Sequence, residues 1–71
     1  MSKLFLYLES KTVKERELLA EQAGTSVIQL YRWSRETDNM SKQKSLFLEE
    51  ILKDAIGITA PELMYPNRFL S

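Results

Sequence analysis

The placement of glycine and proline is the sequence feature that most limits the folds open to this chain. Among its 71 residues are two glycines and two prolines, and each stands where a helix is expected to begin or end. Glycine readily adopts the left-handed conformation that follows many helices, and proline suits a first helical turn because its missing N–H is not needed there. No alternating apolar run is flanked by hairpin turn residues. The sequence therefore predicts short, sharply ended helices and no strands.

Helix N-terminal caps recur along the chain and mark where each helix begins. Serine or threonine followed three residues later by glutamate or glutamine forms a capping box, in which the side chains satisfy two backbone N–H groups. This spacing occurs at Thr12 with Glu15, at Ser26 with Gln29 and at Thr59 with Glu62, and Ser2 and either Asn39 or Ser41 supply further caps. The predicted helices cover residues 3–9, 13–23, 27–35, a fourth segment ending near residue 56, and 60–65, with a polar loop over residues 36–39.

Apolar residues repeat at helical spacing within these segments and indicate which faces are buried. Leu30 and Trp33 lie three residues apart, so they share one face of their helix and are expected in the core. The same reasoning assigns to the core Leu19, Ala20 and Ala23 of the second helix, and Leu48, Ile51, Leu52 and Ala55 of the fourth. A single core shared by five short helices follows from this pattern.

Length and composition agree with one small domain. A chain of 71 residues with 44% apolar and 28% charged residues suits one globular unit. We assign residues 1–66 to this domain and residues 67–71 to a C-terminal tail. The expected fold class is all-α, a compact bundle of five short helices.

The residue types that the chain lacks argue against catalysis and metal binding. It contains no cysteine and no histidine, which removes thiolate ligands, the commonest metal ligand and the commonest general base. Glu49 and Glu50 are adjacent on a predicted helix, so their side chains point in different directions. No glycine-rich loop is present to bind a phosphate group. We therefore expect neither an enzyme nor a bound cofactor or metal.

The segment over residues 16–35 carries the functional information. It predicts two helices joined by a tight turn at Gly24, with the small residue Ala20 four positions earlier. A small side chain there lets the second helix cross the first closely, and Leu30 and Trp33 anchor the second helix in the core. Its opposite face and N-terminal end then stay open, which suits insertion into the major groove and contact with a phosphate group.

This segment resembles the helix-turn-helix of the phage repressor and Cro superfamily. The motif's small, glycine and apolar positions are occupied by Ala20, Gly24, Leu30 and Trp33. One departure is the residue after the glycine, Thr25, where the family often has an aliphatic residue. The wider chain is similar to small Cro-like and YdaS-type regulators. The resemblance implies a lambda repressor-like fold and a sequence-specific, double-stranded DNA-binding transcriptional regulator of phage or prophage type, with residues 27–35 as the recognition helix.

The resemblance also implies which residues face DNA. Arg32 is the first candidate for reading a base, because its guanidinium can pair with guanine O6 and N7. We expect Val27, Ile28, Arg32 and Arg35 to protrude into solvent. The implied base contacts are Val27, Ile28, Tyr31, Arg32 and Arg35, and the implied phosphate contacts are Arg16, Thr25, Ser26, Lys42 and Lys44.

Each of these assignments has a structural alternative. Val27 and Ile28 would instead be partly buried core residues, because apolar side chains usually lie inside. Tyr31 would pack on the first helix. The remaining basic residues, Arg32, Arg35, Lys42 and Lys44, would be solvated surface charges. Exposed side chains at positions 27, 28 and 31 would favour contact with DNA, and buried ones would favour the structural alternative.

The charge pattern leaves a second function open. The formal net charge is zero, whereas nucleic-acid binders usually carry a basic excess. Residues 25–44 hold four basic and two acidic residues, and residues 45–71 hold two basic and four acidic residues. Such a bipolar chain can still present a positive face to phosphates. The alternative is a protein-interaction module, such as an antirepressor or antitoxin-like partner, that keeps the fold without binding DNA.

The expected partners are a double-stranded DNA operator and a second copy of the chain. One recognition helix contacts few base pairs, so a homodimer on half-sites roughly 34 Å apart is the ordinary arrangement. No apolar run approaches the roughly 20 residues of a membrane span, and no signal-peptide pattern is present, so we expect a cytoplasmic protein. Candidate dimer contacts are Phe47, Tyr65, Phe69 and Leu70.

Overall fold

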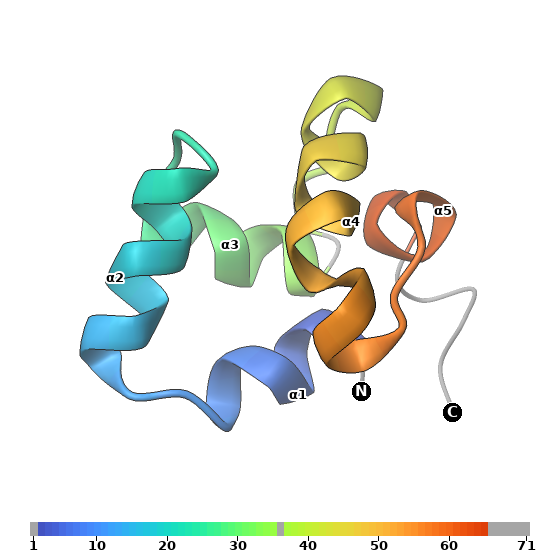
Figure 1. Ribbon diagram of the computed structural model, residues 1–71. Coiled ribbons are helices and arrows are strands. Elements are labelled where there is room, and N and C mark those ends of the chain that lie inside the picture. Colours follow the sequence, from blue (N-terminus) through green and yellow to red (C-terminus); the bar gives the residue numbers. More distant parts are fainter. Residues whose placement is uncertain (1, 36, 66–71) are drawn as a thin grey trace.

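Helices account for all the regular structure in the computed structural model, which describes residues 2–35 and 37–65 (Figure 1). Within these residues no strand occurs, and the expected all-α bundle of five helices is confirmed. The tail at residues 67–71 lies outside the described part of the chain. The helices are α1 (Lys3–Glu9), α2 (Val13–Gln22), α3 (Val27–Ser34), α4 (Lys42–Ile56) and α5 (Ala60–Met64).

The helix ends lie close to the expected positions. Ala23, Arg35 and Tyr65 were expected as last helical residues, but each is the C-cap that follows the helix. Thr12 forms the expected capping box: its hydroxyl accepts from the Glu15 amide at 3.2 Å, and Glu15 Oε1 accepts from the Thr12 amide at 3.0 Å. Ser41, rather than Asn39, caps α4.

Two of the expected capping boxes do not form. The Ser26 hydroxyl accepts from the Gln29 amide at 3.1 Å, but the Gln29 side chain donates to Asp38 instead of reaching back to Ser26. Thr59 makes no cap hydrogen bond with a backbone amide. At the start of α5 the amide of Ala60 donates instead to Glu49 Oε1 at 2.9 Å. A side chain from α4 therefore satisfies a helix end that the local sequence pattern assigned to Thr59.

The helices share one core of leucines. Leu8, Leu30, Leu48 and Leu52 are completely buried, and Trp33 is buried as expected. Met40 is also buried, although the sequence placed it beside a polar loop. The full cluster comprises Leu4, Leu8, Leu19, Ala20, Ala23, Leu30, Trp33, Met40, Leu48, Leu52, Ile58 and Leu63.

The buried face of α4 is rotated relative to the expected stripe. Leu48 and Leu52 are buried, but Ala55 is exposed, so its assignment to the core is wrong. The buried stripe runs instead from Ser45 through Leu48 and Leu52 to the half-buried Ile56. At about 100° per residue, this spacing moves the centre of the buried face away from Ala55. The error arises because two neighbouring stripes on α4 are almost equally apolar.

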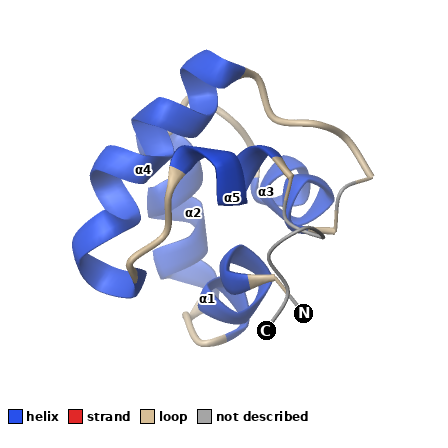
Figure 2. Ribbon diagram, turned by 90° about the vertical axis from the view of Figure 1, so that its right-hand side faces the viewer, coloured by secondary structure: helices blue, strands red, loops and turns tan. Residues whose placement is uncertain are grey.

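The arrangement of the helices leaves one side of α3 open. In Figure 1, α2 and α4 flank α3, and in Figure 2, α3 and α4 lie at opposite sides of the molecule. The Ser2 hydroxyl caps α1 and also donates to the carbonyl oxygen of Ser34 at 2.7 Å, which ties the start of α1 to the end of α3.

Among the described helices, none has the length and apolar character needed to cross a membrane.

Candidate nucleic-acid interface

Three hydrogen bonds around Gly24 close the turn between α2 and α3. The amide of Thr25 donates to the Ala20 carbonyl at 2.9 Å, and the amide of Gly24 donates to Glu21 at 3.1 Å. This pair of hydrogen bonds forms the Schellman motif, which requires a residue in the left-handed conformation. Gly24 meets this requirement with a φ of +67°. Lys44 Nζ from α4 donates to the Ala23 carbonyl, so α4 also holds this turn.

The core side and the outer side of α3 are clearly separated. Leu30 and Trp33 are buried, whereas Ile28 is 71% exposed and the Arg32 side chain is 57% exposed. Arg35 is exposed as well. Val27 is half-buried and packs against the core, so the expectation that it protrudes into solvent is wrong. It precedes Ile28 by about 100° of helical rotation, which turns its side chain inward.

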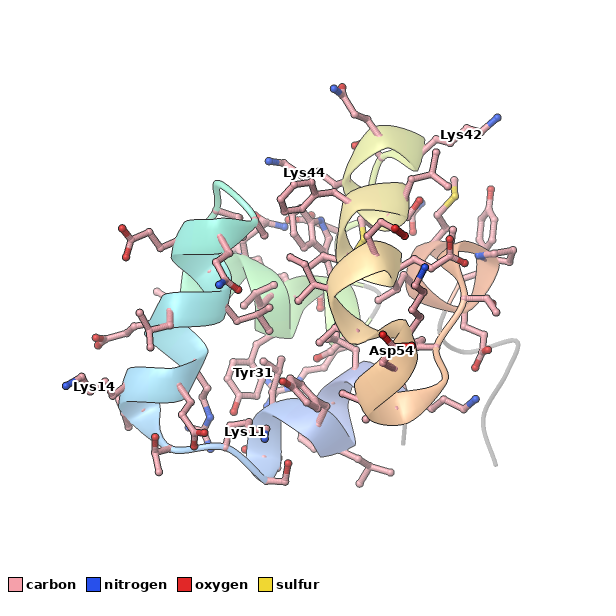
Figure 3. The ribbon with its side chains drawn as sticks, in the orientation of Figure 1. Lys11, Lys14, Tyr31, Lys42, Lys44 and Asp54 are labelled. Carbon is pink, nitrogen blue, oxygen red and sulfur yellow. The ribbon has the colours of Figure 1, made fainter. Side chains whose placement is uncertain are left out.

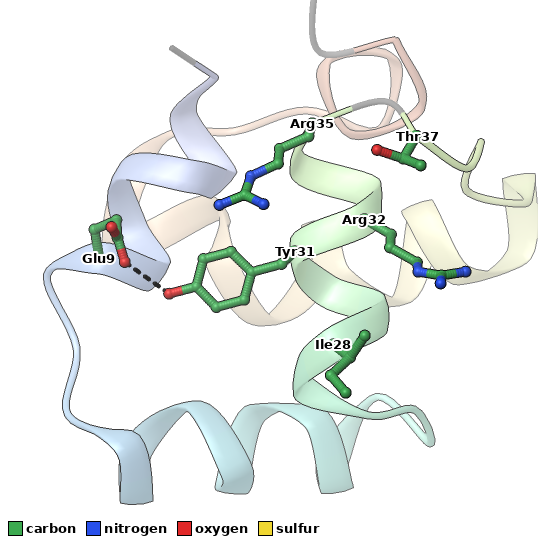
Figure 4. A pocket seen from close by; sticks show the side chains of 6 residues that line it. All are labelled: Glu9, Ile28, Tyr31, Arg32, Arg35 and Thr37. Atoms are coloured by element: carbon green, nitrogen blue, oxygen red, sulfur yellow. Dashed lines mark hydrogen bonds between the residues drawn. The ribbon is translucent and has the colours of Figure 1, made fainter.

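An open recess of about 450 Å³ runs along this outer side of α3. Figure 4 looks onto it and shows Ile28, Arg32 and Arg35 projecting from α3, with Tyr31 directed toward α1. Glu9 borders the recess from α1 and Thr37 from the loop after α3. The α3 surface therefore combines an aliphatic side chain, two guanidinium groups and a phenol.

Tyr31 is fixed in place by its neighbours. Its hydroxyl donates to Glu9 Oε2 at 2.7 Å, and its ring meets the Phe5 ring edge-to-face with centroids 5.9 Å apart. The bond to Glu9 is the main reason why the pKa of Tyr31 is raised above its ordinary value of 10.0, because that bond requires the protonated hydroxyl. Tyr31 thus packs on α1, as the structural alternative proposed.

Two arginines lie over the rings of Phe5 and Tyr31, Arg35 over both and Arg16 over Tyr31 alone. The Arg35 guanidinium lies 5.2 Å from the Phe5 centroid and 5.6 Å from the Tyr31 centroid. Arg16 lies 5.7 Å from the Tyr31 centroid, donates from Nε to the Leu8 carbonyl at 2.6 Å and faces Glu9 at 3.6 Å. Cation–π attraction holds both guanidinium groups near these rings, and Arg35 remains exposed. Arg16 is mostly occupied by contacts within the protein.

The other expected phosphate contacts differ in accessibility. Ser26 is exposed at the N-terminus of α3, and Lys42 is exposed at the start of α4. Thr25 is half-buried, and Lys44 is half-buried by its bond to Ala23. Ser26 and Lys42 therefore remain the accessible members of this set. Of the candidate dimer contacts, Phe47 and Tyr65 are exposed, and Phe69 and Leu70 lie outside the described residues.

Lys11, Lys14 and Gln29 were not among the predicted site residues. Figure 3 shows Lys11 and Lys14 near the start of α2, at the end of the molecule away from Lys42 and Lys44. Their position beside the first capping box was the available signal. Gln29 was considered only as part of a capping box, yet it donates to Asp38 Oδ2 at 3.2 Å. No local pattern predicts that contact.

Comparisons with protein-family models, with curated proteins and with solved structures found no match to this chain. Among residues 2–35 and 37–65, no three acidic residues gather closely enough to hold a metal ion. The exposed face of α3, with its two arginines, is therefore the feature from which a function can be argued.

Proposed function

We propose that the protein is a transcriptional regulator of Cro-like, helix-turn-helix type that binds double-stranded DNA with α3 in the major groove. The observation that carries this proposal is the division of α3 into a buried face and an exposed face that bears Ile28, Arg32 and Arg35. A helix is about 10–12 Å across with its side chains, and the major groove of B-DNA is about 12 Å wide. The exposed face can therefore reach base edges without rearrangement of the core.

The side chains of this face match groups in the major groove. Arg32 supplies a planar fork for guanine O6 and N7, and Ile28 supplies an aliphatic surface for a thymine methyl group. Arg35, oriented by the Phe5 and Tyr31 rings, is suited to a phosphate or a second guanine. Lys14 and Lys42 lie at opposite ends of the molecule in Figure 3, and we propose that they contact the phosphates of the two strands that border the groove.

Electrostatics limits the strength of binding outside a specific site. The chain has no net charge, so only the local basic residues attract the phosphate backbone. We therefore propose that affinity depends on the specific contacts of α3 and on a homodimer that places two α3 helices in successive major grooves.

The test is selection from a random double-stranded DNA library, followed by titration of the enriched sequence at several salt concentrations. Arg32→Ala is expected to weaken binding to that sequence by about 5- to 150-fold, the cost of one lost bidentate base contact. The matched control is Lys53→Ala, which removes a positive charge from α4 where Lys53 pairs with Glu50 at 2.9 Å. Failure to enrich any sequence, or equal losses in both variants, would contradict the proposal.

One observation favours the alternative of a protein-interaction module. Two carboxylates, Glu9 and Asp38, lie beside the basic and aromatic groups of α3, where they would face phosphates. Under this alternative Ile28 and the neighbouring charges bind a partner protein such as a repressor or toxin. The library selection then enriches no DNA at low salt, and Ile28→Asp abolishes capture of the partner.

A further inference from the structure

One carboxylate oxygen connects two side chains of the α3 face. Asp38 Oδ2 accepts from Gln29 Nε2 at 3.2 Å and lies 3.6 Å from Arg32 Nη1. Gln29 and Arg32 are three residues apart on α3, so their side chains leave the same side of the helix. Asp38 thus holds an amide and a guanidinium next to each other.

The loop after α3 keeps Asp38 in this position. On one side, the amide of Thr37 donates to the Arg32 carbonyl at 2.9 Å, which ties the start of the loop to the last turn of α3. On the other side, Met40 is buried in the core, with only 2% of its surface exposed. With the chain anchored at Thr37 and at Met40, the Asp38 carboxylate reaches Gln29 and Arg32 on α3 while remaining partly exposed.

A stabilising role accounts poorly for this contact. The side chains of Arg32 and Asp38 are 57% and 45% exposed, and ion pairs of that kind add little to folding stability. A carboxylate beside a phosphate-binding surface also repels the ligand. The Asp38 carboxylate therefore weakens binding to DNA of any sequence. This loss is offset if Asp38 orders the long side chains of Gln29 and Arg32, which would otherwise lose rotamer freedom on binding.

We propose that Asp38 is a specificity-determining positioning residue that presents Gln29 and Arg32 as one unit for reading bases. This inference rests on the proposed DNA-binding function. Glutamine pairs with adenine N6 and N7, and arginine pairs with guanine O6 and N7. Neighbouring Cβ atoms at this spacing lie about 5–6 Å apart, against a base-pair rise of about 3.4 Å. The half-site therefore contains a guanine and an adenine on adjacent or next-adjacent base pairs, and Asp38 lowers binding to all other DNA.

The experiment compares the enriched sequence with unrelated DNA as ligands of the full chain. For Asp38→Ala, the ratio of specific to non-specific affinity is expected to fall roughly tenfold, while non-specific binding becomes several-fold tighter, since a repelling charge is gone and two side chains are no longer ordered. The control is Asp54→Asn, which removes one negative charge from exposed α4, outside the recess beside α3 (Figure 3). This control is expected to leave the ratio unchanged.

A second variant separates positioning from simple charge repulsion. Gln29→Ala is expected to lose the preference for adenine at one position, and adding Asp38→Ala to it lowers the ratio less than Asp38→Ala does alone. Equal tightening of specific and non-specific binding by Asp38→Ala would overturn the positioning role. If the unmodified chain enriches no DNA, both this inference and the proposed function fail; if it enriches a sequence lacking the guanine and adenine pair, only this inference fails.

Discussion

At the scale of single residues, Gly24 shows how one backbone conformation sets the angle between α2 and α3. Its φ of +67° permits the two hydrogen bonds that close the turn, and a Cβ at this position would stand 3.1 Å from Lys44 Nζ. Gly57 ends α4 with a φ of +62°, but a Cβ there would meet no atom within 4 Å. The two glycines therefore differ in their surroundings and not in their conformation.

Gly24→Ala is expected to destabilise the protein by about 1–2 kcal/mol, because a side chain in the left-handed region is strained, with a further loss from displacing Lys44. In a domain of this size that corresponds to a fall in Tm of roughly 4–16 °C. Urea and thermal unfolding measure both quantities. Gly57→Ala is the control that carries the backbone strain alone, so a larger loss for Gly57→Ala than for Gly24→Ala would disprove the role of Lys44.

Tyr31 provides a titration signal for the contact between α1 and α3. Because the bond to Glu9 raises its pKa, the stabilisation it contributes is complete below the ordinary value of 10.0 and is lost as the pH rises through the higher folded value. An ultraviolet absorbance titration of the folded protein is expected to show one tyrosine ionising late. Tyr31→Phe removes this late component, and Glu9→Gln shifts it down. A late component that persists in Tyr31→Phe would refute the assignment.

At the scale of the helices, α5 depends on α4 for its beginning. Thr59 does not cap α5, and the Ala60 amide donates to Glu49 instead. Pro61 occupies the first turn of this five-residue helix, where its ring presets the backbone angle. A helix this short has little stability of its own, so its formation follows from packing on α4 and from the cap that α4 supplies.

Glu49→Ala is expected to lower the free energy of unfolding by about 0.5–2 kcal/mol, the usual cost of losing a helix cap. The adjacent Glu50 provides a matched control, since Glu50→Ala removes the same group from an exposed pair with Lys53. Its effect is expected to be close to zero. Denaturant unfolding of both variants decides the matter, and equal losses would show that Glu49 acts only as a surface charge.

At the scale of the whole molecule, ion pairs join elements that are distant in sequence. Lys3 of α1 and Glu62 of α5 lie 2.9 Å apart, and together with the Ser2 bond to Ser34 they connect the N-terminal helix to α3 and α5. The hydrogen bond from Lys3, assisted by Thr59, lowers the pKa of Glu62 below its ordinary value of 4.5. The contact between Lys3 and Glu62 therefore makes the stability of the helix bundle decrease in acid.

The sign of that sensitivity follows from the lowered pKa. Glu62 contributes its full stabilisation above pH 4.5, and this contribution is lost as the pH falls through the folded value. Glu62→Gln is therefore expected to be less stable than the unmodified chain at neutral pH and to lose less stability between neutral pH and acid. Thermal melts across this range test it, with Glu17→Gln on the exposed side of α2 as control. Glu15, whose pKa is lowered by its bonds to Thr12, keeps some acid sensitivity in every variant.

Features that depend on neighbours along the chain could be predicted from the amino-acid sequence. Helix number, the cap at Thr12, the left-handed turn at Gly24 and the burial of Leu30 and Trp33 all follow from local hydrogen bonding and helical periodicity. Those signals act within about four residues, and they are strong enough here to establish the fold class and the exposed position of Arg32.

Helix packing selects which helix face is buried and which side chains bond to each other, where the sequence allows several choices. The Glu49 cap on α5, the inward turn of Val27 and the Gln29 contact with Asp38 join residues whose relation depends on how the helices pack. The rotation of α4 that exposes Ala55 has the same origin. Burial and side-chain hydrogen bonds across helices depend on distances in space, and a one-dimensional pattern does not contain them.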